Sequence, residues 1–408
     1  MNTLKKNRSW LLGIILLSYF VVGFPDGSFT VSWDAMEMGL GLVTFHSGII
    51  LVGYSVTYTL AGIILAGLNR FFKLQTIYLM GLVIMALGFV GLAFSFNFTM
   101  VLVTVTIYGF GTGAMASSMN AYMAKHFSAK QNNLMHFFWG AGAAISPLIM
   151  GRFLILDFSQ NYVPGTGYEF YIYDYGWTVG YLTIAAIVGL VGLILIISMS
   201  KKMWMDDDTQ INESTQEQLR NERKRYLTKK WHERVEILTF FFLGGTDYTV
   251  VFFTSTVLMR ERGFSIADVA IFSTIYYVGM TLGRLIFGWL AKWLTETTII
   301  RIGIAIAAAG ILTLWFTSSI VGMALAGFGL GPLLPTLVCD TSNRFTPKII
   351  SKLVGYELAA FGAGIAVLFF LTSVVLTVTT YEALFPIVLG FIVLVFLCNE
   401  ILVRASRA

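Results

Sequence analysis

The sequence predicts an all-α membrane protein in which twelve transmembrane helices form two parallel, pseudo-symmetric bundles of six. The first reason is composition: 57% of the 408 residues are hydrophobic and only 12% are charged, as expected for a chain that folds in lipid. The second is that apolar stretches of about twenty residues recur along the chain. The third is an internal repeat, in which residues of the first half recur at nearly constant offsets in the second half.

The repeat shows as constant offsets between matching residues. Asp26 and Asp247 each lie three residues after a glycine inside an apolar stretch, and they are 221 positions apart (247 − 26). A glycine-rich run that begins at Gly109 returns 218 positions later at Gly327 (327 − 109). Two like-oriented halves, each with an acid in its first helix, are typical of a carrier with a central binding site.

Each apolar stretch is long enough to cross a bilayer, and each is too uniform for a barrel strand, which would alternate. The stretches are predicted at residues 10–33, 44–68, 75–95, 98–124, 134–156, 176–199, 236–259, 266–291, 298–317, 319–341, 351–376 and 381–403. The first follows a basic segment, as a signal peptide would. Its apolar run is too long and no small-residue cleavage site follows, so we expect it to be the first membrane helix.

The polar stretch at 200–235 divides the chain into an N-terminal bundle (1–199), a cytoplasmic linker and a C-terminal bundle (236–408). The linker changes from acidic to basic along its length, so it is either a partly helical amphipathic surface segment or a plain tether. Lys and Arg gather on one predicted side of the membrane, whereas the other side receives Arg152, Arg260 and Arg262. The positive-inside rule therefore places both termini in the cytoplasm, in a protein of the inner (plasma) membrane.

Several functional classes are excluded. The formal charge of +5 is spread over loops rather than gathered into a patch, so nucleic acid is not an expected partner. Cys339 and Cys398 lie in or beside membrane segments, which excludes a disulfide framework. The glycine run at Gly109 follows no strand and lies in a membrane helix, so it is a packing motif rather than a nucleotide loop. The sequence shows no metal-binding spacing and no cofactor or nucleophile motif, and we expect neither a cofactor nor an enzyme.

Twelve helices, a central loop and a parallel repeat resemble the major facilitator superfamily. Residues 279–292 are similar to the loop motif of the superfamily in its second half. Residues 109–149 and 325–337 are similar to the fourth and fifth helices and to the tenth helix of the fucose:proton symporter family within it. The resemblance implies alternating access, a small-molecule substrate, protons as partners and a monomer. Ala116 stands where those symporters carry a glutamate, so neither fucose nor their coupling pair is implied.

Asp26 and Asp247 are the predicted proton-coupling residues. An ionised carboxylate inside hydrocarbon costs at least ~2.5–3.5 kcal/mol, so one that persists usually faces water or a partner. Pro25 and Gly27 flank the first acid and would let the backbone bend there. The alternatives are a helix-end acid near the outer interface for Asp26 and a structural hydrogen bond between helices for Asp247.

The predicted substrate-binding residues come from both halves and combine acids, an amide, an imidazole and aromatic rings. They are Asn120, His136, Trp139, Asp247, Tyr248, Tyr277, Tyr356 and Glu357. Packing roles are the alternative for Asn120 and His136, and a gate or snorkelling role is the alternative for Glu357. Arg284, Asp340 and Arg344 are predicted gate residues; Arg344 follows Asp340 by four positions, which favours a local ion pair, and Arg284 could instead snorkel.

These residues favour one function over another. Several acids and one arginine argue against an anion carrier, which would need convergent cations. Aromatic faces with a few polar groups suit a sugar-like molecule. The sequence therefore predicts proton-coupled uptake of a small neutral sugar-like substrate. The alternative is a proton-coupled exporter of drugs or lipophilic metabolites, since acids in an aromatic cavity also suit lipophilic cations.

Overall fold

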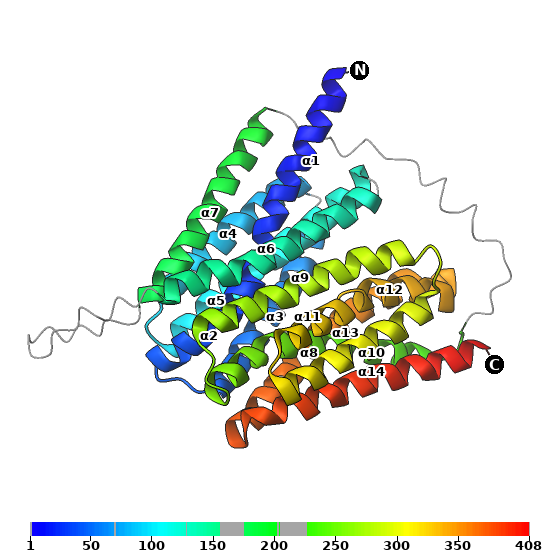
Figure 1. Ribbon diagram of the computed structural model, residues 1–408. Coiled ribbons are helices and arrows are strands. Elements are labelled where there is room, and N and C mark those ends of the chain that lie inside the picture. The colour runs from blue at the N-terminus through cyan, green and yellow to red at the C-terminus, as the bar shows by residue number, and fades with distance from the viewer. Residues whose placement is uncertain are drawn as a thin grey trace, which may run out of the picture. The chain divides into compact units, whose positions relative to one another are not determined.

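The computed structural model describes residues 2–68, 71–127, 129–155, 175–201, 204 and 227–407, and these are almost wholly helical (Figure 1). The helices of the first half are α1 (Asn2–Val22), α2 (Phe24–Gly39), α3 (Thr44–Leu68), α4 (Leu74–Ala93), α5 (Phe98–His126), α6 (Ala129–Ile155) and α7 (Tyr175–Ser200). Those of the second half are α8 (Lys230–Arg260), α9 (Ile266–Leu290), α10 (Glu296–Thr317), α11 (Ile320–Leu330), α12 (Leu333–Arg344), α13 (Pro347–Val378) and α14 (Leu384–Arg407), with the 3-10 helix η3 (Tyr381–Ala383) before the last.

The predicted class is confirmed. Within the described residues, eleven segments are long and apolar enough to cross a membrane, and α3 has the bounds predicted for it. The largest differences at helix starts are in α1, which begins at Asn2 rather than at residue 10, and in α8, which begins at Lys230 rather than at residue 236. Most of the predicted linker lies outside the described residues.

The chain separates into two compact units, residues 1–219 and 220–408. In the first unit, α6 packs on α1 and α2, while α5 packs on α3 and α4. In the second unit, α13 packs on α8, and α11 packs on α9 and α10. The two units therefore use the same set of helix pairs.

Close backbone contacts repeat in the same way. A side chain on Gly142 would collide with the carbonyl of Phe20, and a side chain on Gly364 would collide with the carbonyl of Phe241. Only glycine allows the helices of each pair to approach so closely. The first and fifth membrane helices of each half thus make a close glycine contact at matching places.

A second pair of contacts sets the register of the second membrane helix in each half. Gly109 of α5 lies against the carbonyl of Tyr54 on α3, and Gly327 of α11 lies against that of Tyr276 on α9. The two tyrosines are 222 positions apart (276 − 54). The glycines that contact them are 218 positions apart (327 − 109), so the equivalence of the two contacts follows from helix packing and not from one constant offset in sequence.

Two of the predicted spans are broken. The first is divided at Gly23 into α1 and α2, with Pro25 in the first turn of α2. The tenth, predicted as one helix over 319–341, is divided at Gly331 and Pro332 into α11 and α12. Proline has no N–H to donate and its ring clashes with the preceding turn. Both breaks leave carbonyl groups that another side chain can contact.

Candidate functional site

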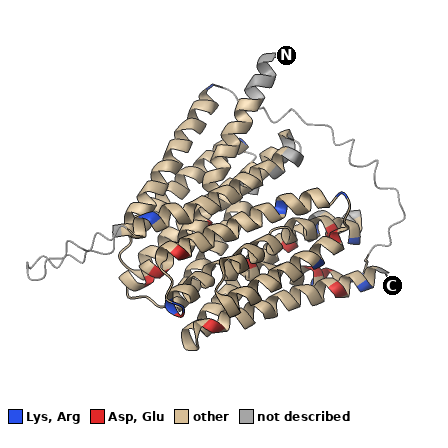
Figure 2. Cartoon of the chain, in the orientation of Figure 1, with Lys and Arg blue, Asp and Glu red and all other residues tan. Residues whose placement is uncertain are grey.

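Charged side chains are sparse along the described helices, and acidic and basic residues occur at only a few places within them (Figure 2). The charged residues predicted for the site lie in three clusters of contacting side chains. One cluster is centred on Asp26, one on Asp247 and one on Arg344. Each group lies within one half of the chain.

The Asp26 cluster consists of Asp26, Tyr19, Asn120, His136 and Trp139. The indole Nε1 of Trp139 donates to Oδ2 of Asp26 at 3.2 Å. The ring of His136 stands edge-on to that of Tyr19, with centroids 5.6 Å apart. Asn120 Nδ2 donates to the Tyr19 hydroxyl at 3.3 Å and to the carbonyl of Ala116 at 2.9 Å. The structure therefore brings four of the predicted site residues together within the first half.

Local structure explains how α1, α2, α5 and α6 supply this cluster. Asp26 lies in the first turn of α2, directly after the break at Gly23. His136 and Trp139 are three residues apart on α6 and so share a face. The backbone contact between α1 and α6 at Gly142 lies one turn from Trp139 and fixes its distance from α2. The helix break at Gly23 and the close packing at Gly142 together place the Asp26 carboxylate within hydrogen-bonding distance of the Trp139 indole.

Three tyrosines complete the surroundings of Asp26. Tyr54 and Tyr58 on α3 and Tyr108 on α5 each lie within electrostatic range of its carboxylate. Tyr54 also contacts the rings of Tyr58 and Tyr108, at centroid distances of 5.9 and 5.4 Å. The acid thus faces aromatic rings and hydroxyl groups from α3 and α5. Sequence reasoning missed Tyr108 and Tyr19, because aromatic residues are too frequent in this chain to be singled out.

The Asp247 cluster consists of Asp247, Tyr276, Arg284 and the carbonyl of Gly331. The Tyr276 hydroxyl donates to Oδ1 of Asp247 and lies 3.1 Å from its backbone carbonyl. Arg284 lies within electrostatic range of the same carboxylate. Its Nε donates to the Gly331 carbonyl at 3.1 Å, at the break between α11 and α12. Arg284, predicted as a gate residue, is therefore grouped with Asp247.

The predicted tyrosines of the second half lie beside this cluster. The tyrosine that reaches Asp247 is Tyr276, whereas its neighbour Tyr277 is the one predicted from the sequence. The two rings meet edge-on at 5.5 Å, and both are buried. Tyr248 packs edge-on against Phe369 at 6.1 Å. Adjacent tyrosines on a helix point about 100° apart, so the sequence alone could not choose between them.

The Arg344 cluster gathers buried polar residues from α8, α12, α13 and α14. Its members are Glu236, Asp340, Thr341, Arg344, Glu357 and Asn399. The predicted pair is present, because Arg344 Nη2 lies 2.6 Å from Oδ2 of Asp340. Arg344 Nη1 also lies 3.2 Å from Oε2 of Glu236. Glu236 was missed because it stood at the predicted helix start, and Asn399 because nothing in its sequence neighbourhood marks it.

Glu357 belongs to this third cluster. Its Oε1 accepts from the Thr341 hydroxyl at 2.9 Å, and its side chain is fully buried. Tyr356, predicted beside it, is 49% exposed, and the Lys352 ammonium lies 5.5 Å from the centre of its ring. The neighbouring residues Tyr356 and Glu357 on α13 therefore face different surroundings.

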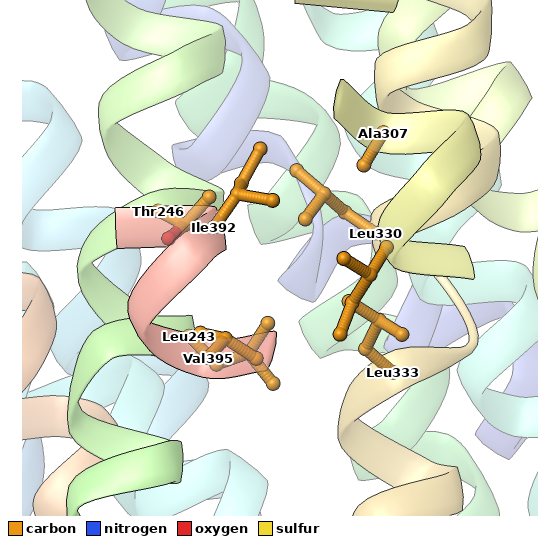
Figure 3. Close-up of a pocket in the computed structure, with 8 residues that line it drawn as sticks. Leu243, Thr246, Ala307, Leu330, Leu333, Ile392 and Val395 are labelled. Carbon is orange, nitrogen blue, oxygen red and sulfur yellow. The ribbon is translucent and has the colours of Figure 1, made fainter. Parts of the chain in front are cut away.

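An apolar pocket in the second half is lined by residues of α8, α10, α11, α12 and α14 (Figure 3). Its lining comprises Leu243, Thr246, Ile304, Ala307, Leu330, Leu333, Ile392 and Val395. The one hydroxyl among them, on Thr246, donates to the carbonyl of Phe242 at 2.8 Å. The pocket has no room for a water molecule. It is a packing gap, and the polar clusters remain the candidate sites.

Metal binding has no support in the part of the chain that the structure describes, where no group of His, Cys, Asp and Glu is arranged to hold an ion. The clusters instead offer hydrogen-bond donors and acceptors beside aromatic rings. Such groups can bind hydroxylated molecules and can hold protons.

Comparison with known proteins identifies the class. The sequence model of the Major Facilitator Superfamily matches residues 15–337 and 235–408. No curated protein matches the chain in sequence. Solved structures are similar in fold: one is a bacterial homologue of the human lysosomal transporter Spinster, in an inward-facing and occupied conformation. It is 16% identical with a TM-score of 0.74, over 98% of this chain and 97% of that one.

Two further solved structures have names that state a substrate. The nucleoside transporter NupG is 12% identical with a TM-score of 0.72, over 96% of this chain and 99% of that one. The E. coli fucose:proton symporter FucP is 17% identical with a TM-score of 0.59, over 96% of this chain and 98% of that one. Identities this low show a shared fold and no more.

Proposed function

This chain belongs to the Major Facilitator Superfamily of membrane transporters, and we propose that it takes up a small neutral, polyhydroxylated substrate together with protons. The observation that carries the proposal is the Asp26 cluster. It combines one acid with an indole, an imidazole, an amide and a phenol. These groups come from four helices of one half.

The cluster has the chemistry to recognise hydroxyl groups. The Asn120 amide can both donate to and accept from a hydroxyl, and it shares that ability with the Tyr19 phenol. Trp139 presents a broad ring on which a sugar ring can stack, while its N–H orients the Asp26 carboxylate. Few polar groups on an aromatic surface are typical of sites for small neutral ligands.

The names of two structural neighbours agree with this substrate class. One is a nucleoside transporter and another a fucose:proton symporter, and both kinds of ligand are neutral and carry several hydroxyl groups. The narrower resemblance to fucose:proton symporters seen in residues 109–149 supports the same class. Those symporters carry a glutamate at the position that Ala116 occupies in this chain. The proposed substrate is therefore the class of neutral polyhydroxylated molecules and not fucose itself.

Protons would be carried by Asp26 and Asp247. Each is an acid on the first membrane helix of its half, where an uncompensated charge is costly. Protonation removes that cost and lets the surrounding helices close. Asp26 can accept a proton while Trp139 and the tyrosines around it remain as donors. Asp340 and Arg344 would form a gate at the helix ends, with both termini in the cytoplasm.

A second candidate function is proton-coupled export of lipophilic cations. It is favoured by the tyrosine rings of Tyr54, Tyr58 and Tyr108 around Asp26, since aromatic faces attract cations. The two functions differ in the charge of the ligand that the Asp26 cluster binds.

Thermal stability of the purified full-length protein separates them. We expect neutral sugars or nucleosides to raise the melting temperature in proportion to the logarithm of their concentration. Asp26→Asn should keep this shift, since an amide still accepts hydrogen bonds. Stabilisation by lipophilic cations alone, lost in Asp26→Asn, would contradict uptake of a neutral substrate and support export.

A further inference from the structure

Two buried acids meet at one hydroxyl group in the Arg344 cluster. The side chains of Glu236 on α8 and Glu357 on α13 are both fully buried. The Thr341 hydroxyl lies 3.3 Å from Oε1 of Glu236 and 2.9 Å from Oε1 of Glu357. It also lies 3.1 Å from the carbonyl of Leu337. A hydroxyl has one hydrogen to donate, so it cannot satisfy all three acceptors.

The single cation of the cluster is already committed. Arg344 is 4% exposed; its Nη1 contacts Glu236, and its Nη2 lies 2.6 Å from Asp340 and donates at 2.6 Å to Oδ1 of Asn399. Three acids therefore surround one guanidinium. Glu357 is the acid that this guanidinium does not contact through any described hydrogen bond or ion pair.

Three buried atoms in the cluster lack a described hydrogen-bond partner. One is Oδ2 of Asp340, which is compensated by its ion pair with Arg344 at 2.6 Å. The other two are Oε2 of Glu357 and Nδ2 of Asn399, each on a fully buried side chain. An ionised Glu357 would leave a charged oxygen in the protein interior with no donor, which is strongly unfavourable. A protonated Glu357 carries no charge and gains a donor of its own. The geometry thus selects the neutral acid.

We propose that Glu357 is a proton-binding site that exchanges its proton with Glu236 across the Thr341 hydroxyl. The site is separate from the proposed coupling acids, because Glu236 precedes Asp247 by eleven residues of α8 (247 − 236), or roughly 16 Å at ~1.5 Å per residue. Loss of the proton places two carboxylates at one hydroxyl. Their repulsion would separate α13 from α8, so the site couples proton release to the packing of these helices.

The charged groups that act on Glu357 are Glu236 on α8 and Arg344 on α12, where Arg344 also pairs with Asp340. Further titratable groups on the helices packed against α13 are His232 on α8 and Cys398 on α14. On α13 itself, Lys352 and Tyr356 are exposed. His232 lies four residues before Glu236 and so on the same face of α8. It is 6% exposed, and its Nδ1 has no described hydrogen-bond partner. His232 is therefore a second titratable group on α8, and it lies between the start of that helix and Glu236.

Infrared difference spectroscopy of the full-length protein in lipid nanodiscs tests the proposal directly. We expect the carbonyl band of a protonated carboxylic acid at neutral pH, and we expect Glu357→Gln to remove it. Glu400→Gln is the matched control, because Glu400 forms a two-point ion pair with Arg301 at 2.7 Å and is ionised. A band that persists unchanged in Glu357→Gln would overturn the proposal.

Thermal unfolding as a function of pH gives a second test that needs no substrate. A folded state that holds an extra proton loses stability as pH rises. The melting temperature of the wild type should therefore fall relative to that of Glu357→Gln as pH rises from about 4, where an unfolded glutamate begins to release its proton, through neutral pH, and the difference should stay constant once the folded Glu357 has also lost its proton. Glu236→Gln should lower it at neutral pH, because this acid contacts Arg344. A Glu357→Gln protein as destabilised as Glu236→Gln would mean that Glu357 is ionised, and would refute the proposal.

Discussion

Asp26 and Asp247 occupy matching places in the two halves, yet they have different partners. Both follow the glycine at which the first membrane helix contacts the fifth, Gly23 in one half and Gly244 in the other. Asp26 accepts a hydrogen bond from Trp139 on α6. Asp247 accepts one from Tyr276 on α9 and lies within range of Arg284.

Equivalent positions explain the difference. Gly23 packs against the carbonyl of Trp139, and Gly244 packs against that of Phe361, 222 positions later (361 − 139). The phenylalanine side chain has no N–H, so the second half cannot form the hydrogen bond that the indole of Trp139 makes. At the same offset, Arg284 corresponds to Gly62 in the first half (284 − 62). Beside the acid, the first half thus has the indole donor of Trp139, and the second half has the guanidinium cation of Arg284.

The comparison teaches that the repeat preserves the scaffold more than the chemistry. Backbone contacts at glycine are the same in both halves because helix separation depends on them. The side chains beside the acids have diverged. We expect Asp26 to act mainly through substrate and proton, and Asp247 to act also through its charge opposite Arg284.

The largest expected effect is that of Asp247→Asn. The change removes the acid that balances Arg284, so we expect proton-driven accumulation in proteoliposomes to fall at least about tenfold and stability to fall by about 1–3 kcal/mol. The double variant Asp247→Asn/Arg284→Gln should be less destabilised than the sum of the single changes. Additive losses would show that the two charges do not interact.

Asp26→Asn should separate binding from coupling. The amide oxygen can still accept from Trp139, so substrate affinity should stay within about threefold, a difference of under ~0.7 kcal/mol. Accumulation driven by an imposed pH gradient should be lost, because an amide takes up no proton. Counterflow and gradient-driven uptake measured on the same proteoliposomes give the two quantities. Retained accumulation would assign coupling to Asp247 alone.

Trp139→Phe makes the first half resemble the second at this position. It removes a hydrogen bond to a charged group, for which ~1.5–3 kcal/mol is typical, together with part of the stacking surface. We expect affinity measured by calorimetry to fall about tenfold or more. The converse change Phe361→Trp is the control and should leave affinity unchanged. Equal effects of the two changes would remove the distinction between the halves.

Asn120→Ala should have the smallest effect. Loss of one neutral hydrogen bond costs about 0.5–1.5 kcal/mol, which lowers affinity by up to roughly tenfold. Asn120 also donates to Tyr19, so part of the loss would reflect a displaced phenol. Tyr19→Phe, measured in the same calorimeter, separates the two contributions. Unchanged affinity in both variants, with folding intact, would place the substrate elsewhere.

The fold class, the approximate positions of the spans and the division into two like halves follow from the amino-acid sequence alone. Span length and apolar content are set by bilayer thickness, so they can be read from a single chain. The sequence also selected Asp26, Asn120, His136 and Trp139, because polar groups inside a membrane helix are rare enough to stand out.

Tertiary structure decided which of these residues meet. It chose Tyr276 over Tyr277, grouped Arg284 with Asp247, and placed Glu357 with Glu236. Each choice depends on the rotation of one helix against another. In a membrane protein both the lipid-facing and the packed faces are apolar, so the sequence pattern carries little information about that rotation. Close contacts at glycine and the proline breaks fix it, and these act only once the helices are packed.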